Sequence, residues 1–154
     1  MNRAGPRLTR RSLPMALLRA REAVMTRFRP LLAKHGVTEQ QWRVVRILGE
    51  AGPLDATELA SRAAILTPSL TRIIRDLGER KLISKRRNPG DSRRLVLDVT
   101  AKARQMIIEM LPDITAAYEA LETAFGAERL DALLDTLEAL DATVPSTTGP
   151  PSSR

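Results

Sequence analysis

Apolar residues recur at helical spacing along most of the chain, so the sequence predicts a mainly helical protein. The first helix should span residues 13–34, where Pro30 is expected to kink or tighten it. His35-Gly36 should end that helix. The segment TEQQ at 38–41 has the pattern of a capping box and opens a second helix. That helix should stop at Gly52-Pro53.

Residues 55–80 predict two short helices joined by a tight turn. DATE at 55–58 is a second capping box and opens the first of them. Thr67 is expected to be the N-cap of the second, with Pro68 at the first helical position, where its missing N–H has no cost. One face of this second helix is apolar, at Leu70, Ile73, Ile74 and Leu77. The organisation is that of a helix-turn-helix.

Two short strands are predicted next, in ISKRR at 83–87 and LVLDVT at 95–100. The stretch NPGDSRR at 88–94 lies between them and should form the tip of a hairpin. Asp91, two residues before Arg93, could accept a bidentate hydrogen bond from a nearby guanidinium and hold it in place. A helix-turn-helix followed by a two-stranded hairpin is a winged helix, so the expected fold class is mainly α (α+β).

The C-terminal part predicts two more helices. Thr100 should cap a long helix that runs to about Phe125, with a kink at Pro112. Gly126 breaks it, and a last helix at 127–142 carries a stripe of leucines. Because no strands remain to bury that stripe, the helices at about 13–35 and 101–142 are expected to form the dimerisation region of a homodimer. The DNA-binding lobe would then span about 53–100, within a domain of residues 13–142.

Charge is distributed unevenly along the 154 residues, whose net charge is +7. Residues 67–94 hold nine Lys or Arg and three Asp or Glu, a net charge of +6. Residues 113–141 hold one Arg and eight Asp or Glu, a net charge of −7. A basic segment favours an anionic partner, most often nucleic acid, and the acidic helices would be repelled by it. The chain ends, 1–12 and 143–154, have the composition of disordered tails.

Several classes of protein are disfavoured by composition. There is no cysteine, one histidine, no glycine-rich phosphate loop and no candidate carboxylate pair, so we expect no enzyme, no metal site and no cofactor. No run of about 18 apolar residues and no signal-type segment is present, so neither a membrane span nor export is expected. The expected location is the cytoplasm.

The segment LGERKLISKRRNPGDSRRLVLDVT, following a helix-turn-helix and preceding a long helix, resembles the MarR family of dimeric transcription regulators. Asp91 and Arg93 match the D-x-R motif of its wing, although Ala103 stands where the family usually has glycine. The resemblance covers about residues 12–142. Residues 16–50, with the pieces AREA, FRP and TEQQWR, resemble the subgroup that represses homoprotocatechuate degradation operons. That resemblance implies an aromatic carboxylic acid as effector.

The winged-helix arrangement predicts which residues would contact DNA. The second helix of the motif enters the major groove, where Arg72 is the best candidate for a bidentate contact to guanine. Arg93 would enter a narrow minor groove, and Arg86 would neutralise phosphate. The simpler alternative for each is a solvated surface charge. The full set is Thr67, Pro68, Ser69, Thr71, Arg72, Arg75, Arg86, Asp91, Arg93 and Arg94.

The family resemblance also nominates an effector site. Family members that bind aromatic acids use an arginine of the first helix, which corresponds to Arg21 here; its alternative role is an ion pair with Glu22 or Glu39. Phe28 and Trp42 could stack on an aromatic ring, although a core role is the more common one for such a tryptophan. Arg46 is a second candidate partner for the acid.

Two functions remain open from the sequence. The first is a dimeric repressor of an aromatic-acid catabolic operon that binds a pseudo-palindromic operator and is released by an aromatic carboxylate. The second is a winged-helix DNA-binding or architectural protein with a different effector or none.

Overall fold

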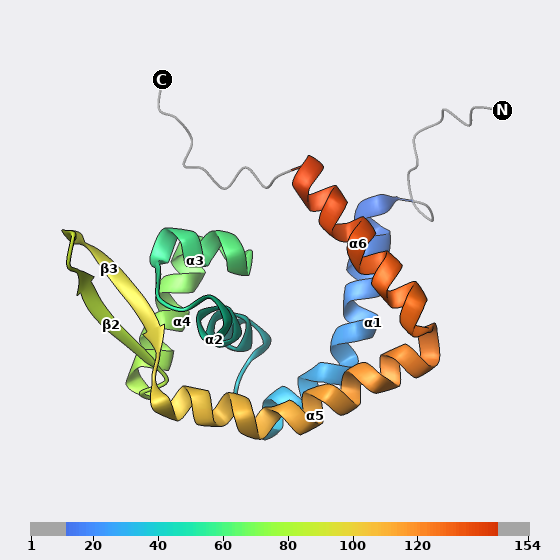
Figure 1. Cartoon of the computed structure of the whole chain (residues 1–154), viewed down its shortest axis with the longest axis horizontal. Coiled ribbons are helices and arrows are strands. Elements are labelled where there is room, and N and C mark those ends of the chain that lie inside the picture. The colour runs from blue at the N-terminus through green and yellow to red at the C-terminus, as the bar shows by residue number, and fades with distance from the viewer. Residues whose placement is uncertain (1–11, 145–154) are drawn as a thin grey trace.

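The computed structural model describes residues 12–144 of the chain. Six helices and three short strands follow one another in this range (Figure 1). They are α1 (Leu13–Lys34), α2 (Glu39–Ala51), β1 (Leu54–Asp55), α3 (Ala56–Ala63), α4 (Thr67–Glu79), β2 (Ile83–Asn88), β3 (Asp91–Val99), α5 (Ala101–Phe125) and α6 (Ala127–Thr143). Most of the two predicted tails lies outside the described residues. Within the described residues, no helix has the length and apolarity to cross a membrane.

The elements form a lobe and a helical arm. The lobe consists of α2, α3, α4 and the strands, which lie together at one end of the molecule in Figure 1. The arm consists of α1, α5 and α6, and α1 and α6 lie at the other end. The curved helix α5 runs from one to the other and carries Pro112 near its middle. Pro112 and Pro30, where the sequence predicts kinks, both lie inside continuous helices, and neither ends its helix.

The sheet has one strand more than the sequence predicts. β1 pairs antiparallel with β3, with Leu54 opposite Leu97, and the strand order is β1-β3-β2. The hairpin turn is also shorter than expected, because Asn88 is already paired with Asp91 and only Pro89 and Gly90 lie between the strands. Arg93 and Arg94 therefore lie within β3 and not at the tip.

Four of the predicted helix starts depend on side-chain caps, with different outcomes. The cap of α5 is confirmed, since Thr100 Oγ1 accepts from the backbone N–H of Ala103 at 3.2 Å. The capping box of α2 is confirmed, since Thr38 and Gln41 exchange both hydrogen bonds at 3.1 Å. Asp55 accepts from the backbone N–H of Glu58 at 2.8 Å, but the Glu58 carboxylate pairs with Arg62 instead of completing the box. The prediction for Thr67 was wrong.

At the start of α4, Leu66 is the N-cap and Thr67 is the first helical residue. The cap has no side-chain hydrogen bond. Pro68, which lies in the first turn of α4, favours the start of the helix here. The backbone of Leu66 is extended, and its carbonyl accepts a hydrogen bond from the Leu70 N–H at 2.9 Å.

The larger core joins α2 to the helix-turn-helix and the sheet. Leu48 from α2, Leu59 from α3, Leu77 from α4 and Leu97 from β3 are almost completely buried in it. A smaller cluster around Leu32 and Met110 packs α1 on α5. Side chains of α2 and α4 thus pack closely in the same core.

Candidate functional site

The basic surface of the lobe is built on α4 and β3. The inward side chains of α4 (Leu70, Ile73, Ile74 and Leu77) are buried, which leaves the opposite face of the helix in solvent. All ten residues predicted to contact DNA are exposed. Six of the ten lie on α4: Thr67, Pro68, Ser69, Thr71, Arg72 and Arg75.

The arginines of this surface differ in how they are held. Arg94 Nη1 lies 3.7 Å from Asp55 Oδ2, which links β3 to the start of α3. Arg75 Nη2 lies 3.5 Å from Asp76 Oδ1. Among residues 12–144, the guanidinium groups of Arg72 and Arg93 have no hydrogen-bond or ion-pair partner. These two cations are therefore available to an external anion.

The wing aspartate has a different partner from the one expected. Asp91 Oδ1 accepts a hydrogen bond from the backbone N–H of Arg93 at 3.0 Å, and no guanidinium of the described chain bonds to it. Arg87 Nη1 instead donates to the Ser92 carbonyl at 2.9 Å. Asp91 thus fixes the backbone from which the Arg93 side chain extends and leaves the charge of Arg93 free.

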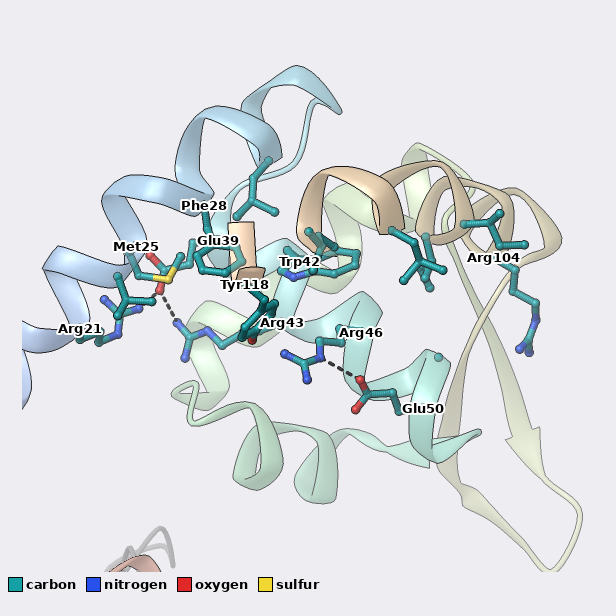
Figure 2. Close-up of a pocket in the computed structure, with 17 residues that line it drawn as sticks. Arg21, Met25, Phe28, Glu39, Trp42, Arg43, Arg46, Glu50, Arg104 and Tyr118 are labelled. Atoms are coloured by element: carbon teal, nitrogen blue, oxygen red, sulfur yellow. Dashed lines mark hydrogen bonds and ion pairs between the residues drawn. The ribbon is translucent and has the colours of Figure 1, made fainter. Parts of the chain in front are cut away.

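A pocket of about 700 Å³ lies between the arm and the lobe (Figure 2). Its walls come from α1, α2 and α5, and a volume of this size is typical of small-molecule sites. All four residues predicted to bind an effector line it: Arg21, Phe28, Trp42 and Arg46. The sequence predicts each of these residues separately, and the structure places all four, from α1 and α2, in one pocket.

Three aromatic side chains lie in this pocket. Phe28 is buried and meets Tyr118 edge to face, with ring centroids 5.2 Å apart. Trp42 is half-buried and also packs against the smaller core cluster. Phe28 and Trp42 thus serve the core and the pocket wall together. The sequence did not predict Tyr118 as a pocket residue, because the local pattern of α5 does not show which of its faces is turned to the pocket and which to solvent.

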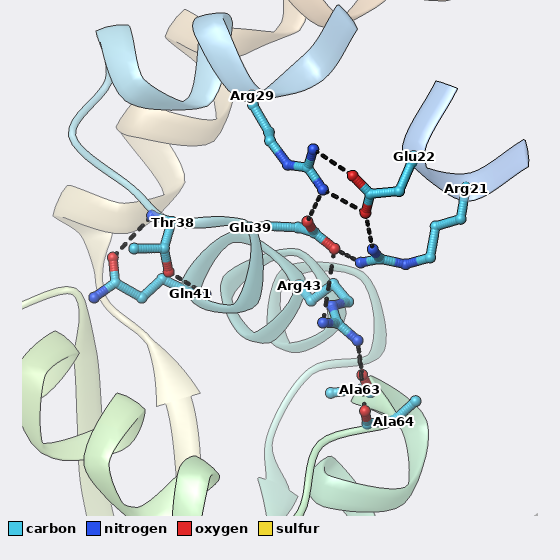
Figure 3. A network of polar contacts seen from close by, with 9 residues as sticks. All are labelled: Arg21, Glu22, Arg29, Thr38, Glu39, Gln41, Arg43, Ala63 and Ala64. Carbon is cyan, nitrogen blue, oxygen red and sulfur yellow. Dashed lines mark hydrogen bonds and ion pairs between the residues drawn. The ribbon is translucent and has the colours of Figure 1, made fainter. Parts of the chain in front are cut away.

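Arg21 and Arg43, two arginines that line the pocket, belong to a network of ion pairs and hydrogen bonds (Figure 3). Arg21 pairs with Glu39 and lies 3.4 Å from Glu22, so the alternative role considered for Arg21 is present in the structure. Arg29 makes a two-pronged contact with Glu22, at 2.8 and 2.9 Å. That hydrogen bonding from Arg29 lowers the pKa of Glu22 below its ordinary value.

Arg46 lies elsewhere in the pocket and is also paired. Its Nε is 2.8 Å from Glu50 Oε1, one turn later in α2 (Figure 2). The bond to Glu50, with a smaller contribution from Tyr118, raises the pKa of Arg46 above its ordinary value. Arg46 is therefore a charged group whose partner, Glu50, is exposed to solvent.

Arg43 also lines the pocket, and no sequence pattern points to it. Its Nη1 donates to the Ala63 carbonyl at 2.8 Å, across 20 residues of sequence. Burial lowers its pKa, and the positive charge of Arg21 lowers it further. Only the packing of α2 on α3 reveals this contact, because an arginine in the middle of an amphipathic helix ordinarily points to solvent.

Comparison with known proteins agrees with this geometry. Residues 37–95 match the MarR family. The homoprotocatechuate degradative operon repressor of Escherichia coli is 41% identical over 127 residues, which cover 82% of this chain and 86% of the relative.

Two solved structures have the same fold over most of their length. NadR in complex with 4-hydroxyphenylacetate is 40% identical, with a TM-score of 0.76 over 84% of this chain and 92% of that one. The transcriptional repressor CouR bound to a 23-mer DNA duplex is 29% identical, with a TM-score of 0.76 over the same shares of the two chains. These likenesses extend across both the lobe and the helical arm.

Proposed function

The chain belongs to the MarR family, and from that premise we propose that it is a homodimeric repressor released from its operator by an aromatic carboxylic acid. Family membership makes it a DNA-binding transcription regulator and not an enzyme. The observation that carries the proposal is that the predicted effector residues share one pocket, whose α2 wall belongs to the core of the DNA-binding lobe. With chromosomal DNA as its target, the protein would work in the cytoplasm.

The DNA-binding role is supported by the exposure of α4 and by its free cation. A recognition helix enters the major groove with its N-terminal residues facing the bases. Arg72 and Ser69 lie on that part of α4, exposed to solvent. Arg93 on β3 would contact the neighbouring minor groove. Arg86, Arg94 and Arg75 would add phosphate contacts that fix the register of the protein on DNA.

The homodimer is supported by the surface of the arm. Within residues 12–144, the large exposed apolar side chains lie on α1, α5 and α6, or directly after α6 at Val144, apart from Leu66 and Leu95. α6 buries none of its residues within the protomer. An apolar surface of this kind is typical of a protein–protein interface, and a two-fold axis would present two α4 helices to successive major grooves of a pseudo-palindromic operator.

The effector class is supported by the chemistry of the pocket. Aromatic side chains offer stacking to a ring, and Arg21 and Arg46 offer guanidinium forks that match a carboxylate. NadR, one of the similar proteins, was crystallised with 4-hydroxyphenylacetate, and the Escherichia coli relative represses a homoprotocatechuate degradative operon. An aromatic acid of that chemistry is therefore the proposed effector here.

The test is fluorescence anisotropy with labelled DNA from upstream of the protein's own gene. Protein is titrated at fixed salt, and 4-hydroxyphenylacetate or 3,4-dihydroxyphenylacetate is then added. Binding that either acid reverses supports the proposal. Binding that no aromatic acid changes would leave a winged-helix DNA-binding protein with another effector or none, which is the alternative function.

Arg93→Ala is expected to weaken operator binding roughly tenfold at matched salt, because it removes a cation from the minor-groove contact. The unfolding midpoint should stay unchanged, since the guanidinium has no partner in the described part of the protein. Anisotropy and thermal unfolding measure the two quantities. Arg62→Ala is the control for loss of charge, because Glu58 is the one ion-pair partner of Arg62 among residues 12–144. An unaltered operator affinity would exclude Arg93 from DNA binding.

Arg21→Ala is expected to keep operator binding and to require at least about tenfold more aromatic acid for release. The reason is that a charge-assisted hydrogen bond to a carboxylate contributes about 1.5–3 kcal/mol. Effector titration of the preformed complex gives the midpoint. Lys34→Ala, at the C-terminal end of the same helix and outside the pocket, is the control. Release at the wild-type concentration would rule out Arg21 as a ligand contact.

A further inference from the structure

Arg43 connects the pocket wall to the turn between α3 and α4 (Figure 3). Its Nη1 donates to the Ala63 carbonyl at 2.8 Å and lies 3.5 Å from the Ala64 carbonyl. α3 ends at Ala63, and Ala64 has the left-handed conformation, with φ of 51°, that turns the chain towards α4. The guanidinium therefore contacts the backbone that determines where α4 begins.

Glu39, one turn earlier in α2, joins the same guanidinium to α1. Its Oε1 lies 3.8 Å from Arg43 Nη2 and also pairs with Arg21. Its Oε2 lies 3.5 Å from Arg29 Nη2. A continuous series of charged contacts thus runs from α1 through Glu39 and Arg43 to the turn before α4.

The contacts of Arg43 are incomplete. Its Nε is buried and lacks a hydrogen-bond partner among residues 12–144. Its carboxylate neighbour is at 3.8 Å, beyond hydrogen-bonding distance. The side chain remains charged at neutral pH because arginine does not lose its proton in proteins. A half-buried cation with an unused donor and a loosely held partner is able to exchange one set of partners for another.

We infer that Arg43 is the positioning residue through which an occupied pocket displaces α4, an inference that rests on the proposed effector function. An effector carboxylate that pairs with Arg21 takes the place of Glu39 there, and its negative charge repels Glu39 towards Arg43. Without the acid, Arg29 still holds Glu39, so loss of Arg21 alone does not start this exchange. Glu39 then closes on Arg43 and draws the guanidinium away from the Ala63 carbonyl. The turn loses its restraint, and the two α4 helices of the dimer no longer match the operator.

The experiment measures a coupling factor, the ratio of operator dissociation constants with and without saturating 4-hydroxyphenylacetate. A wild-type factor of roughly 5–150 is expected for an allosteric regulator. Arg43→Met should reduce this factor to less than about twofold, while calorimetry on the DNA-free variant still detects binding of the acid. Anisotropy on full-length protein gives both dissociation constants for each variant.

Two further variants complete the design. Arg62→Met removes an arginine of α3 that pairs with Glu58 alone within the described part of the chain, so it should keep the wild-type coupling factor. Glu39→Gln leaves the Arg43 contact with Ala63 in place but removes the charge that links it to α1. It should lower the coupling factor as Arg43→Met does, and it provides the test if Arg43→Met does not fold.

The outcomes separate this inference from the proposed function. If wild-type protein fails to respond to either phenylacetate, the proposed effector class is wrong and the inference falls with it. If wild type responds and the Arg43→Met and Glu39→Gln variants keep their coupling factors within twofold of it, the effector function stands and Arg43 is not the link. If Arg43→Met no longer binds the acid at all, Arg43 is a ligand contact, which also overturns the inference.

Discussion

Leu133→Glu and Leu134→Glu together are expected to produce a monomer that binds the operator roughly 10²–10⁴-fold more weakly than the wild type. Both leucines are more than 40% exposed in the protomer, and α6 buries none of its residues there. Two carboxylates buried in the proposed interface would be desolvated without partners, which a dimer cannot offset. The loss of affinity follows because a second lobe tethered to the first binds its half-site at high effective concentration.

Sedimentation or light scattering gives the mass, and anisotropy gives the operator affinity. Ala132→Glu with Thr136→Glu is the matched control, because it adds the same charge to exposed positions on a different face of α6. The lobe should stay folded in both variants, since α6 is not part of its core. A double leucine variant that retains the mass and operator affinity of the dimer would show that this stripe is not the interface.

The helices of the lobe were predictable because their signals are local. α4 buries four apolar residues spaced at helical intervals, and its opposite face is polar. The spacing of the apolar residues was therefore enough to predict both the helix and its exposed face. The capping box of α2 depends on Thr38 and Gln41, three residues apart. Local patterns of this kind are present in the sequence whatever the rest of the chain does.

What the sequence missed depends on contacts between distant segments. β1 is two residues long and exists because Leu54 and Asp55 meet β3 some 40 residues later, and a pair of residues has no periodicity. Tyr118 joins the pocket by packing on Phe28 across 90 residues. The Arg43 contact with Ala63 likewise requires the crossing of α2 and α3 to be known.

The residues of the candidate sites also fall into two groups, those predictable from local sequence and those that only the structure brings together. Arg72 and Arg93 could be chosen as candidate DNA contacts from residue type and position in a motif, because the role proposed for them requires only exposure at the surface of the lobe. The effector residues could be nominated from resemblance, but their common pocket could not. That Arg21 is held by Glu39 was one of two alternatives from the sequence, and the structure shows the ion pair and the pocket lining together.

Leu48→Ala is expected to lower the free energy of unfolding by about 2–5 kcal/mol. Leu48 is completely buried where α2 meets α3, α4 and the sheet, so truncation removes apolar contacts and leaves a cavity. For a protein of this size the midpoint of thermal unfolding should fall by roughly 5–15 °C. Calorimetry at one fixed protein concentration is required, because dissociation of a dimer makes the midpoint concentration-dependent.

Leu66→Ala is the matched control, since Leu66 is 70% exposed in the same lobe and its truncation should change the free energy of unfolding by less than about 0.5 kcal/mol. Equal midpoints for the two variants would mean that α2 is not held by the core of the lobe. That result would also weaken the mechanism, because the pocket affects α4 only if α2 moves with it. A large loss in Leu48→Ala alone would support the rigid connection between α2 and α4 that the proposed release of DNA by the effector requires.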